Sequence, residues 1–323
     1  MTRFHKKTMA ILATVMVLVM LLTVSASPVL AATYSGGSGT EGDPYQISTA
    51  ADWTTLRNTS GDWGKYFILT ADIDFGEAAL TPVGGSTQFT GSFDGDGHAL
   101  SNATINSGAG MESCYVGVFG RVSSAGLIRD LRAEDIDVTG SRRVGGLVGE
   151  NNGTIINCGA TGDVTGLSFE DEMMGTMGPG YIGGLVGISE SGGSVTGSYA
   201  TGDVTTPTIS SGGGRYVGGL VGSNYSGSGI TDSYATGAVA GYSEVGGLVG
   251  WNRTALTRGY ATGAVTGSSD VGGLVGDNIA TVTASSWDTQ TTGQRSRDRG
   301  TRLTTAAMTH PSPGRAAPCW HFG

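Results

Sequence analysis

A pair of adjacent glycines recurs inside the same apolar hexapeptide at five places in this chain. The hexapeptide is VGGLVG at Val144, Val217, Val245 and Val271, and IGGLVG at Ile182. Successive copies lie 38, 35, 28 and 26 residues apart. Repetition at such periods is typical of solenoids, in which each repeat is one supersecondary unit that buries its apolar face against its neighbours.

A second block follows each of the first four glycine pairs: CGATGDV, SYATGDV, SYATGAV and GYATGAV, beginning at residues 158, 198, 233 and 259. Both blocks are too short and too rich in Val, Thr and Gly for helices, so each repeat is expected to form two or three short strands. With one repeat per turn, the sequence predicts an all-β fold. We expect a right-handed parallel β-helix, or β-solenoid, of eight to ten coils with a short N-terminal capping helix.

The glycine pair and a column of asparagines are given structural roles by this interpretation. Glycine inside a strand marks a bulge or a close backbone approach. We therefore expect the pair to form a thin wall or corner with positive φ, where any side chain would collide. An asparagine follows four of the hexapeptides and is expected to build a hydrogen-bonded ladder between coils. The ladder residues are Asn151, Asn224, Asn252 and Asn278.

The two ends of the chain differ from the repeats. Residues 1–31 are typical of a secretory signal peptide, with basic residues before an apolar run too short for a membrane span, so no stable span is expected after cleavage. Residues 32–66 are interpreted as a cap segment, 67–143 as degenerate coils, 144–290 as five repeats and 291–323 as an atypical, disordered tail. Within the cap segment, Thr49 and Asp52 predict the start of the capping helix.

The pattern VGGLVGxN followed by SYATGxVxG resembles the GLUG motif of bacterial and archaeal secreted and surface proteins. The upstream stretch FTGSFDGDGHALSNATI (89–105) is similar to the segment that precedes such repeats, and LTTAAM (303–308) to their final capping segment. The resemblance covers about residues 35 to 310. It implies extracellular repeats, secreted or at the cell surface, without a shared reaction.

The charge of the chain bears on its partners, and its cysteine content bears on disulfide bonds. Residues 33–294 hold ten basic and 26 acidic side chains. Because phosphate contacts need the opposite sign, nucleic acid is excluded as a partner. The three cysteines, Cys114, Cys158 and Cys319, are an odd number, and Cys158 stands where other repeats carry small residues. We therefore expect no disulfide framework.

Asp94 and Asp96 form the best acidic cluster, in FDGDGH. Paired carboxylates can catalyse sugar hydrolysis or bind calcium, but alternating Asp and Gly is also what a tight turn requires. The run lacks the twelve-residue calcium-loop pattern, so we expect no metal site and no cofactor, with Ca²⁺ as an unsupported alternative. Asp72 and Asp74 share one face of a strand, where a solvated edge is the commoner situation.

Extra residues in the first two repeats fall between the ATGxV block and the next glycine pair, at 167–181 and 206–216. Insertions on one edge of a solenoid often form its binding face, although a plain flexible loop is the alternative. The first insertion combines acidic and apolar side chains suited to a partner. These candidate binding residues are Phe169, Glu170, Asp171, Glu172, Met173, Met174 and Met177.

No catalytic motif is recognisable in the sequence, and function has to be argued from a site. The expected function is therefore a non-catalytic secreted or cell-surface repeat protein for adhesion, or for binding an extracellular glycan or a cell-surface protein. The alternative is a polysaccharide-degrading β-helix enzyme, a lyase or a hydrolase. A third option is an ice- or surface-binding face built on the column Thr161, Thr201, Thr236 and Thr262.

Overall fold

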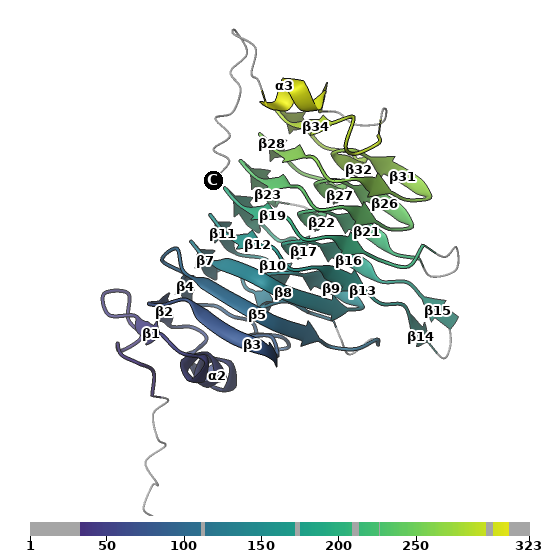
Figure 1. The fold of residues 1–323 in the computed structure, drawn as a ribbon. Coiled ribbons are helices and arrows are strands. Elements are labelled where there is room, and N and C mark those ends of the chain that lie inside the picture. The colour runs from purple at the N-terminus through teal and green to yellow at the C-terminus, as the bar shows by residue number, and fades with distance from the viewer. Residues whose placement is uncertain are drawn as a thin grey trace, which may run out of the picture. The chain divides into compact units, whose positions relative to one another are not determined.

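Each repeat makes one turn of a coil, and successive turns stack so that equivalent strands pair in parallel (Figure 1). In the turn that spans residues 215–240, the chain passes through β21 (Arg215–Gly218), β22 (Val221–Asn224), β23 (Gly229–Thr231), β24 (Tyr234–Ala235) and β25 (Val239–Ala240). The computed structural model describes residues 33–110, 114–171, 175–208, 213–225, 227–294 and 300–309. A parallel β-solenoid, as predicted, is confirmed.

Sheet 1 contains nine strands, one per coil, which agrees with the eight to ten coils expected. Its strands are β1 (Tyr45–Ile47), β2 (Tyr66–Leu69), β4 (Ser92–Asp94), β7 (Leu127–Arg129), β11 (Thr154–Ile156), β18 (Ser194–Thr196), β23, β28 (Leu256–Thr257) and β33 (Val282–Thr283).

Sheets 2 and 3 contain the two halves of the glycine-rich block. Sheet 2 consists of β6 (Phe119–Val122), β10 (Val148–Asn151), β17 (Val186–Ser189), β22, β27 (Val249–Asn252) and β32 (Val275–Asn278). Sheet 3 consists of β9 (Arg142–Gly145), β16 (Gly180–Gly183), β21, β26 (Ser243–Gly246) and β31 (Ser269–Gly272).

Sheet 4 has long strands in the early coils; four later coils each add two short strands in their place, and the last two strands of the sheet are added singly. The long strands are β3 (Ile73–Ala79), β5 (Ala99–Asn106) and β8 (Arg132–Gly140). The short strands are β12 (Gly159–Ala160), β13 (Val164–Gly166), β19 (Tyr199–Ala200), β20 (Val204–Thr205), β24, β25, β29 (Tyr260–Ala261), β30 (Val265–Thr266), β34 (Ser286–Asp288) and β35 (Thr301–Leu303).

Columns of one residue type fill the interior of the coils. The leucine of each glycine-rich block is fully buried and hydrogen bonds through its backbone to the leucine of the next coil, at 2.8 to 3.0 Å. The column consists of Leu147, Leu185, Leu220, Leu248 and Leu274. Because every coil presents the same apolar set at the same level, the core is continuous along the stack.

The glycine pair is required by close backbone contact, as at Gly218 and Gly219. A Cβ on Gly218 would lie 2.1 Å from the Val221 carbonyl oxygen, and one on Gly219 would lie 2.1 Å from that of Gly247 in the next coil. The expectation of positive φ at the pair is wrong. The left-handed residue lies two positions earlier in each repeat, with φ between 48° and 63°, and turns the chain before the glycines begin. This left-handed column consists of Arg143, Tyr181, Tyr216, Glu244 and Asp270.

The asparagine column lies inside the coils and links them through side chains. The Asn224 amide donates to Asn252 Oδ1 at 2.8 Å, and the Asn252 amide donates to Asn278 Oδ1 at 2.7 Å. Asn151 donates to the hydroxyl of Ser189, which replaces asparagine in the second repeat. Buried amides need such partners, because leaving one unsatisfied costs about 1–3 kcal/mol.

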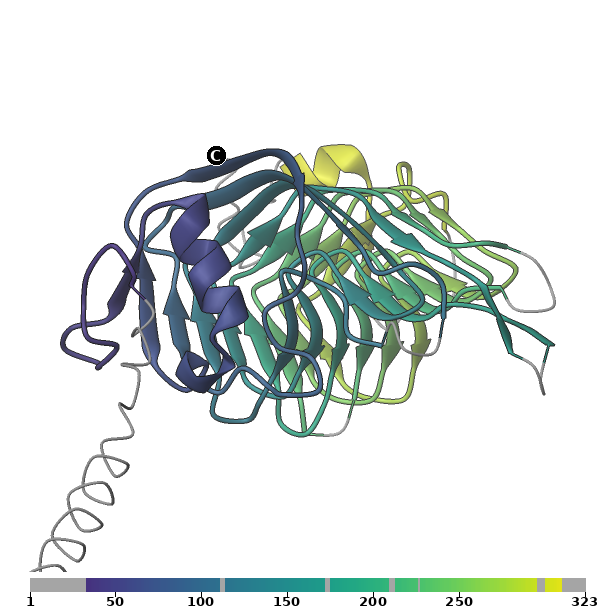
Figure 2. The same cartoon turned by 90° about the horizontal axis from the view of Figure 1, so that it is seen from below.

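The helix α2 (Ala50–Asn58) covers the first coil (Figure 2). Thr49 and Asp52 form the predicted capping box, in which each side chain accepts the other's backbone N–H. The buried Trp53 ring packs edge-on against Phe93 and Phe119 of the following coils, at centroid distances of 5.8 and 5.9 Å. A short 3-10 helix, η1 (Ser60–Asp62), follows α2 before β2 begins. The helix therefore shields a sheet end that would otherwise be open.

The C-terminal region departs from the expected disordered tail in one stretch. Residues 301–303 form β35, which pairs in parallel with β34, and α3 (Thr305–Thr309) follows. Trp287, in place of the repeated tyrosine, is buried and donates from its indole to the Gln294 carbonyl oxygen. The predicted signal peptide lies outside the described residues. No helix in the described ranges is long and apolar enough to cross a membrane.

Cys158 provides a chemical test of this interior. It is fully buried, its thiol donates to the Ile156 carbonyl oxygen, and burial raises the pKa of the thiol to about 12. At pH 8, roughly one thiol in ten thousand would be ionised, so alkylation of the native protein is expected to spare Cys158. Peptide mapping after iodoacetamide treatment should find Cys158 modified only in denaturant. Modification of native Cys158 at the rate of the half-buried Cys114 would contradict this packing.

Candidate ligand-binding surfaces

Asp94 and Asp96 are brought together in a tight turn. Asp94 Oδ1 accepts the backbone N–H of Asp96 at 2.9 Å, and Asp96 has a φ of 48°. The second oxygen of Asp94 pairs with the Arg129 guanidinium of the next coil. Both Asp94 oxygens are therefore engaged, and the pair is arranged as a turn and an ion pair rather than as a free acid and base.

The carboxylates of Asp72 and Asp74 accept hydrogen bonds from different parts of the chain. Asp72 Oδ1 accepts the backbone N–H of Ala99 at 2.9 Å and contacts His98 Nδ1 at 3.1 Å, and these contacts lower the pKa of the carboxyl. Asp74 accepts the N–H of Gly76, which lowers its pKa as well. Across the described residues, no group of three or more His, Cys, Asp or Glu side chains is placed to hold a metal ion.

The first insertion forms a hairpin of β14 (Phe169–Asp171) and β15 (Gly175–Met177), antiparallel to each other (Figure 1). Phe169 is buried and pairs with Met177, which is half-buried. Glu172, Met173 and Met174 lie outside the described residues, and Glu170 and Asp171 are described in their backbone only. The binding role predicted for this insertion stays a prediction.

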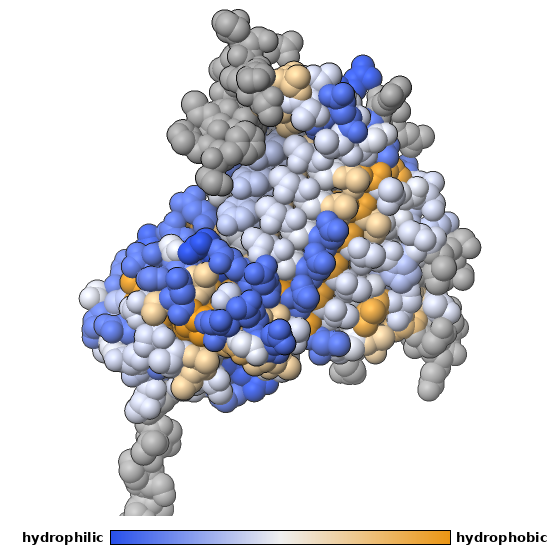
Figure 3. Space-filling view, viewed as in Figure 1, coloured by the Kyte–Doolittle hydropathy of each residue, from blue (hydrophilic) through white to orange (hydrophobic). Residues whose placement is uncertain are grey.

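The outer face of sheet 4 carries side chains in columns. Tyr199, Tyr234 and Tyr260 stack with centroid distances of 5.3 and 4.8 Å. The half-exposed threonine column Thr161, Thr201, Thr236 and Thr262 lies beside them. Further along the strands, Asp203 accepts the backbone N–H of Ala238, while its own N–H donates to Asp163. Bands of one polarity therefore cross several coils in Figure 3, and the threonines share this face with rings and carboxylates.

A second set of side chains runs along the outside of sheets 2 and 3, and we call it the aromatic–arginine ridge. Tyr181 stacks on Tyr216 with centroids 5.1 Å apart and planes 17° apart, and Tyr216 stacks on Trp251 at 5.1 Å and 29°. All its rings are half-buried. The ridge consists of Tyr115, Arg121, Arg143, Tyr181, Arg215, Tyr216, Tyr225, Trp251 and Arg253.

Guanidinium groups extend the ridge at both ends. Arg143 lies 5.2 Å from the Tyr115 ring and 5.8 Å from the Tyr181 ring. At the other end, Arg253 lies 4.7 Å from the Trp251 ring and 5.2 Å from the Tyr225 ring. Such cation–π contacts contribute about 0.5–1 kcal/mol each at exposed sites and hold the rings in place. No carboxylate within the described ranges forms an ion pair with Arg253, which is exposed.

Left-handed backbone positions and a buried carboxylate build the ridge. Arg143, Tyr181 and Tyr216 all have positive φ, which is uncommon for such large side chains. Beneath the first end, Glu150 is almost fully buried and pairs with Arg121 at 2.8 Å and Arg143 at 3.1 Å. The backbone therefore directs these side chains onto the neighbouring sheet, and Glu150 anchors the two arginines.

Comparison of the sequence with protein families finds the GLUG motif at residues 140–165, 178–205 and 213–240. Three of the repeats match the GLUG motif. Each contains one glycine-rich block and one ATGxV block, and in the structure each forms one full coil. The resemblance predicted from the sequence is confirmed. The coils that begin at β26 and β31 keep the same pairing register beyond the matched residues.

Two curated proteins share part of this sequence. Halomucin of Haloquadratum walsbyi is 35% identical over 175 residues, which cover 50% of this chain and 2% of that protein. A protein of Evansella cellulosilytica, provisionally named a Gly-rich membrane protein, is 36% identical over 134 residues, which cover 38% of this chain and 15% of that protein. The chain therefore spans a small part of the length of either relative.

One solved structure has the same fold. It is a crystal structure of a protein from Bacteroides ovatus that is provisionally named an immunoglobulin A1 protease. The TM-score is 0.65, the sequence identity is 24%, and the match covers 84% of this chain and 86% of the other. At this identity the likeness establishes a shared solenoid architecture and carries no activity across.

The ridge was not predicted from the sequence, although three of its aromatic residues are adjacent to the glycine-rich blocks. Tyr181 and Tyr216 stand immediately before IGGLVG and VGGLVG, and Trp251 immediately follows a third copy. These aromatic residues are not shared by all repeats, because the same positions hold Glu244, Asp270 and Asp277 in other coils. An aromatic residue at the same offset in two successive repeats is the signal that identifies the stack.

Proposed function

We propose that this chain is a non-catalytic module, exported to the cell surface or the surroundings of the cell, that binds extracellular polysaccharide along the aromatic–arginine ridge. The observation that carries the proposal is the ridge itself, a row of half-buried rings and guanidinium groups that continues from coil to coil. Aromatic bodies with polar tips suit ligands that present both apolar and hydroxyl surface.

The periodicity of the ridge supports a polymer as the ligand. Tyr181, Tyr216 and Trp251 repeat at about 5 Å along the stack, so successive groups offer similar contacts at regular intervals. A ligand with a regular repeat can engage several of them at once and gains affinity from multivalency. The Arg253 guanidinium adds donors for sugar hydroxyls or carboxylates.

The contacts of the acidic side chains favour binding of a polysaccharide over its cleavage by hydrolysis or by a lyase reaction. Asp94 is held through one oxygen by the Asp96 backbone N–H and through the other by Arg129, so it is not free as a general acid or base. One relative is named as a membrane protein, which supports a location at the cell surface. The predicted signal peptide supports export in the same way.

The test is retention of the full chain on immobilised polysaccharides, compared with the double variant Tyr216→Ala and Trp251→Ala. Retention is expected to fall at least about fivefold in the double variant, because two stacked rings at about 0.5–1.5 kcal/mol each are lost. The matched control is Tyr234→Ala, which removes a ring from the separate tyrosine stack on sheet 4. Equal retention of all three proteins, or no retention of the wild-type chain, would contradict the proposal.

A further inference from the structure

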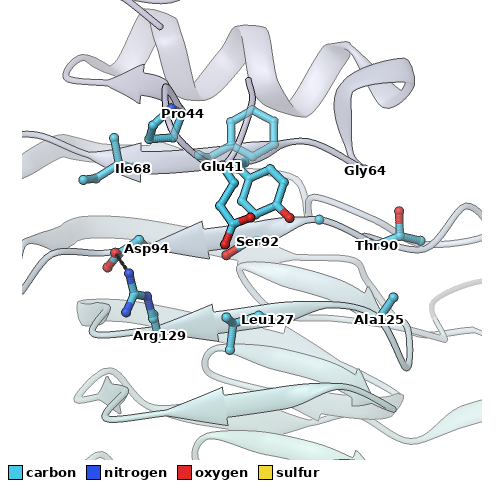
Figure 4. A pocket seen from close by; sticks show the side chains of 13 residues that line it. Glu41, Pro44, Gly64, Ile68, Thr90, Ser92, Asp94, Ala125, Leu127 and Arg129 are labelled. Carbon is cyan, nitrogen blue, oxygen red and sulfur yellow. Dashed lines mark hydrogen bonds and ion pairs between the residues drawn. The ribbon is translucent and has the colours of Figure 1, made fainter. Parts of the chain in front are cut away.

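A cleft of about 480 Å³ opens on the outer face of sheet 1 in the first coils (Figure 4). Its floor consists of two rows of side chains on β2, β4 and β7. Tyr66, Ser92 and Leu127 form one row, and the register of the strands places Ile68, Asp94 and Arg129 in the next. One wall is the loop that carries Glu41 and Pro44.

The wall is held rigidly in place. Gly37 and Gly39 have φ of 79° and 76°, and a Cβ on Gly37 would lie 1.8 Å from the Pro44 carbonyl oxygen. Thr40 and Asp43 close the loop with reciprocal backbone hydrogen bonds at 3.2 Å. The N–H of Tyr66 donates to the Gly39 carbonyl oxygen, which ties the loop to β2. The cleft therefore exists before a ligand arrives and little ordering cost opposes binding.

The lining of the cleft contains an exposed aromatic side chain, Tyr66, and an ion pair, Asp94–Arg129. Tyr66 is 38% exposed and is one of two exposed large apolar side chains in the described part of the chain, the other being Ile279. Beneath it, Phe67 and Phe93 stack at 6.4 Å and support the floor. The half-exposed Arg129 remains bound to Asp94 and presents its remaining guanidinium N–H groups towards solvent.

We propose that this cleft binds one end of a neutral saccharide chain, a role that rests on the proposed function and adds a second, separate site to it. Tyr66 provides the apolar surface for a sugar ring. Ser92, Glu41 and the Asp94–Arg129 pair provide hydroxyl, acceptor and donor groups around it, and the Glu41 side chain reaches from the loop towards Ser92 (Figure 4). Sugar hydroxyls act as both donors and acceptors, so such mixed partners satisfy them.

Charge and shape define the ligand further. Glu41 and Asp94 outnumber Arg129, so the lining carries a net negative charge that disfavours uronate or sulfate groups. The loop closes one side of the cleft, which suits a chain end rather than the middle of a long polymer. The ridge lies on sheets 2 and 3 and the cleft on sheet 1, so the two sites use different faces of the coil.

The experiment is calorimetric titration of the full chain with neutral tetrasaccharides, namely the β-1,4 glucose, xylose and mannose oligomers, and with tetragalacturonate as the acidic counterpart. We expect at least one neutral oligomer to bind and tetragalacturonate to bind at least about tenfold more weakly. Tyr66→Ala is expected to weaken neutral binding about two- to tenfold. Ile279→Ala is the matched control, an exposed apolar side chain outside the cleft, and is expected to change nothing.

The outcomes separate this inference from the proposed function. No binding of any neutral tetrasaccharide, or equal binding by wild type and Tyr66→Ala, would overturn the inference. Polysaccharide retention through the ridge would still stand in that case. If neither polysaccharides nor oligomers bind, both proposals fail. Unchanged circular dichroism and melting temperature of Tyr66→Ala show that a loss of binding reflects the missing ring.

Discussion

Gly218→Ala is expected to destabilise the protein by more than about 4 kcal/mol, because the new Cβ has no space to occupy. It would lie 2.1 Å from the Val221 carbonyl oxygen and 2.7 Å from the Gly250 N of the next coil. Both obstacles are backbone atoms, one in the same coil and one in the next, so relief requires the corner of this coil to shift and the next coil to move away. The measurement is urea unfolding followed by circular dichroism, with midpoints compared between variants.

Gly229→Ala is the control for this experiment. Gly229 also lies in a strand of the same coil, but nothing approaches within 4 Å of the position its Cβ would take. The free energy of unfolding of the Gly229→Ala variant is expected to differ from that of the wild type by less than about 1 kcal/mol in either direction. Similar midpoints for the two variants would show that the glycine pair does not hold the coils at contact distance.

The second large effect is expected at Glu150, whose carboxylate is buried beneath the ridge. One oxygen accepts from Arg121 at 2.8 Å and the other lies 3.1 Å from Arg143 Nε. Glu150→Gln removes the charge that compensates both guanidinium groups, so a loss of about 3–5 kcal/mol is expected in the free energy of unfolding. The ridge should also loosen at the Tyr115 end, since both arginines lie over that ring.

Glu244→Gln provides the comparison for Glu150. Glu244 pairs with Arg215 at 2.9 Å, and that arginine side chain is 56% exposed. Solvent screens this pair, so its loss is expected to cost less than about 1 kcal/mol. Thermal melts of the two variants and the wild-type chain, at equal pH and salt concentration, measure both losses of stability. A Glu150→Gln protein as stable as Glu244→Gln would contradict this role of Glu150 as the anchor of the two half-buried arginines.

Repetition made much of the fold predictable. The leucine column, the asparagine ladder and the glycine contacts recur at fixed offsets, so each could be assigned once and applied to every coil. The helix over residues 50–58 was predictable for a different reason, because the capping box of Thr49 and Asp52 is a local signal. The corner itself was misassigned, since the left-handed residue is Tyr216 or its counterpart rather than the glycine.

The candidate surfaces depend on residues that only some of the repeats carry. Tyr216 and Trp251 lie 35 positions apart and meet only because successive coils stack in register. Glu41 and Arg129 are still further apart in sequence, and the register of β2, β4 and β7 brings them to one cleft. Neither pair carries a local pattern, so the fold is needed to show that these residues meet on one surface.

The most direct test of binding without turnover is to incubate the full chain with each polysaccharide and measure retention and newly formed chain ends in the same sample. The proposed function predicts retention on at least one polysaccharide with no increase in reducing ends or unsaturated products, with or without added Ca²⁺. Release of such products at a rate abolished by Asp94→Asn would contradict it and identify a polysaccharide-degrading enzyme instead.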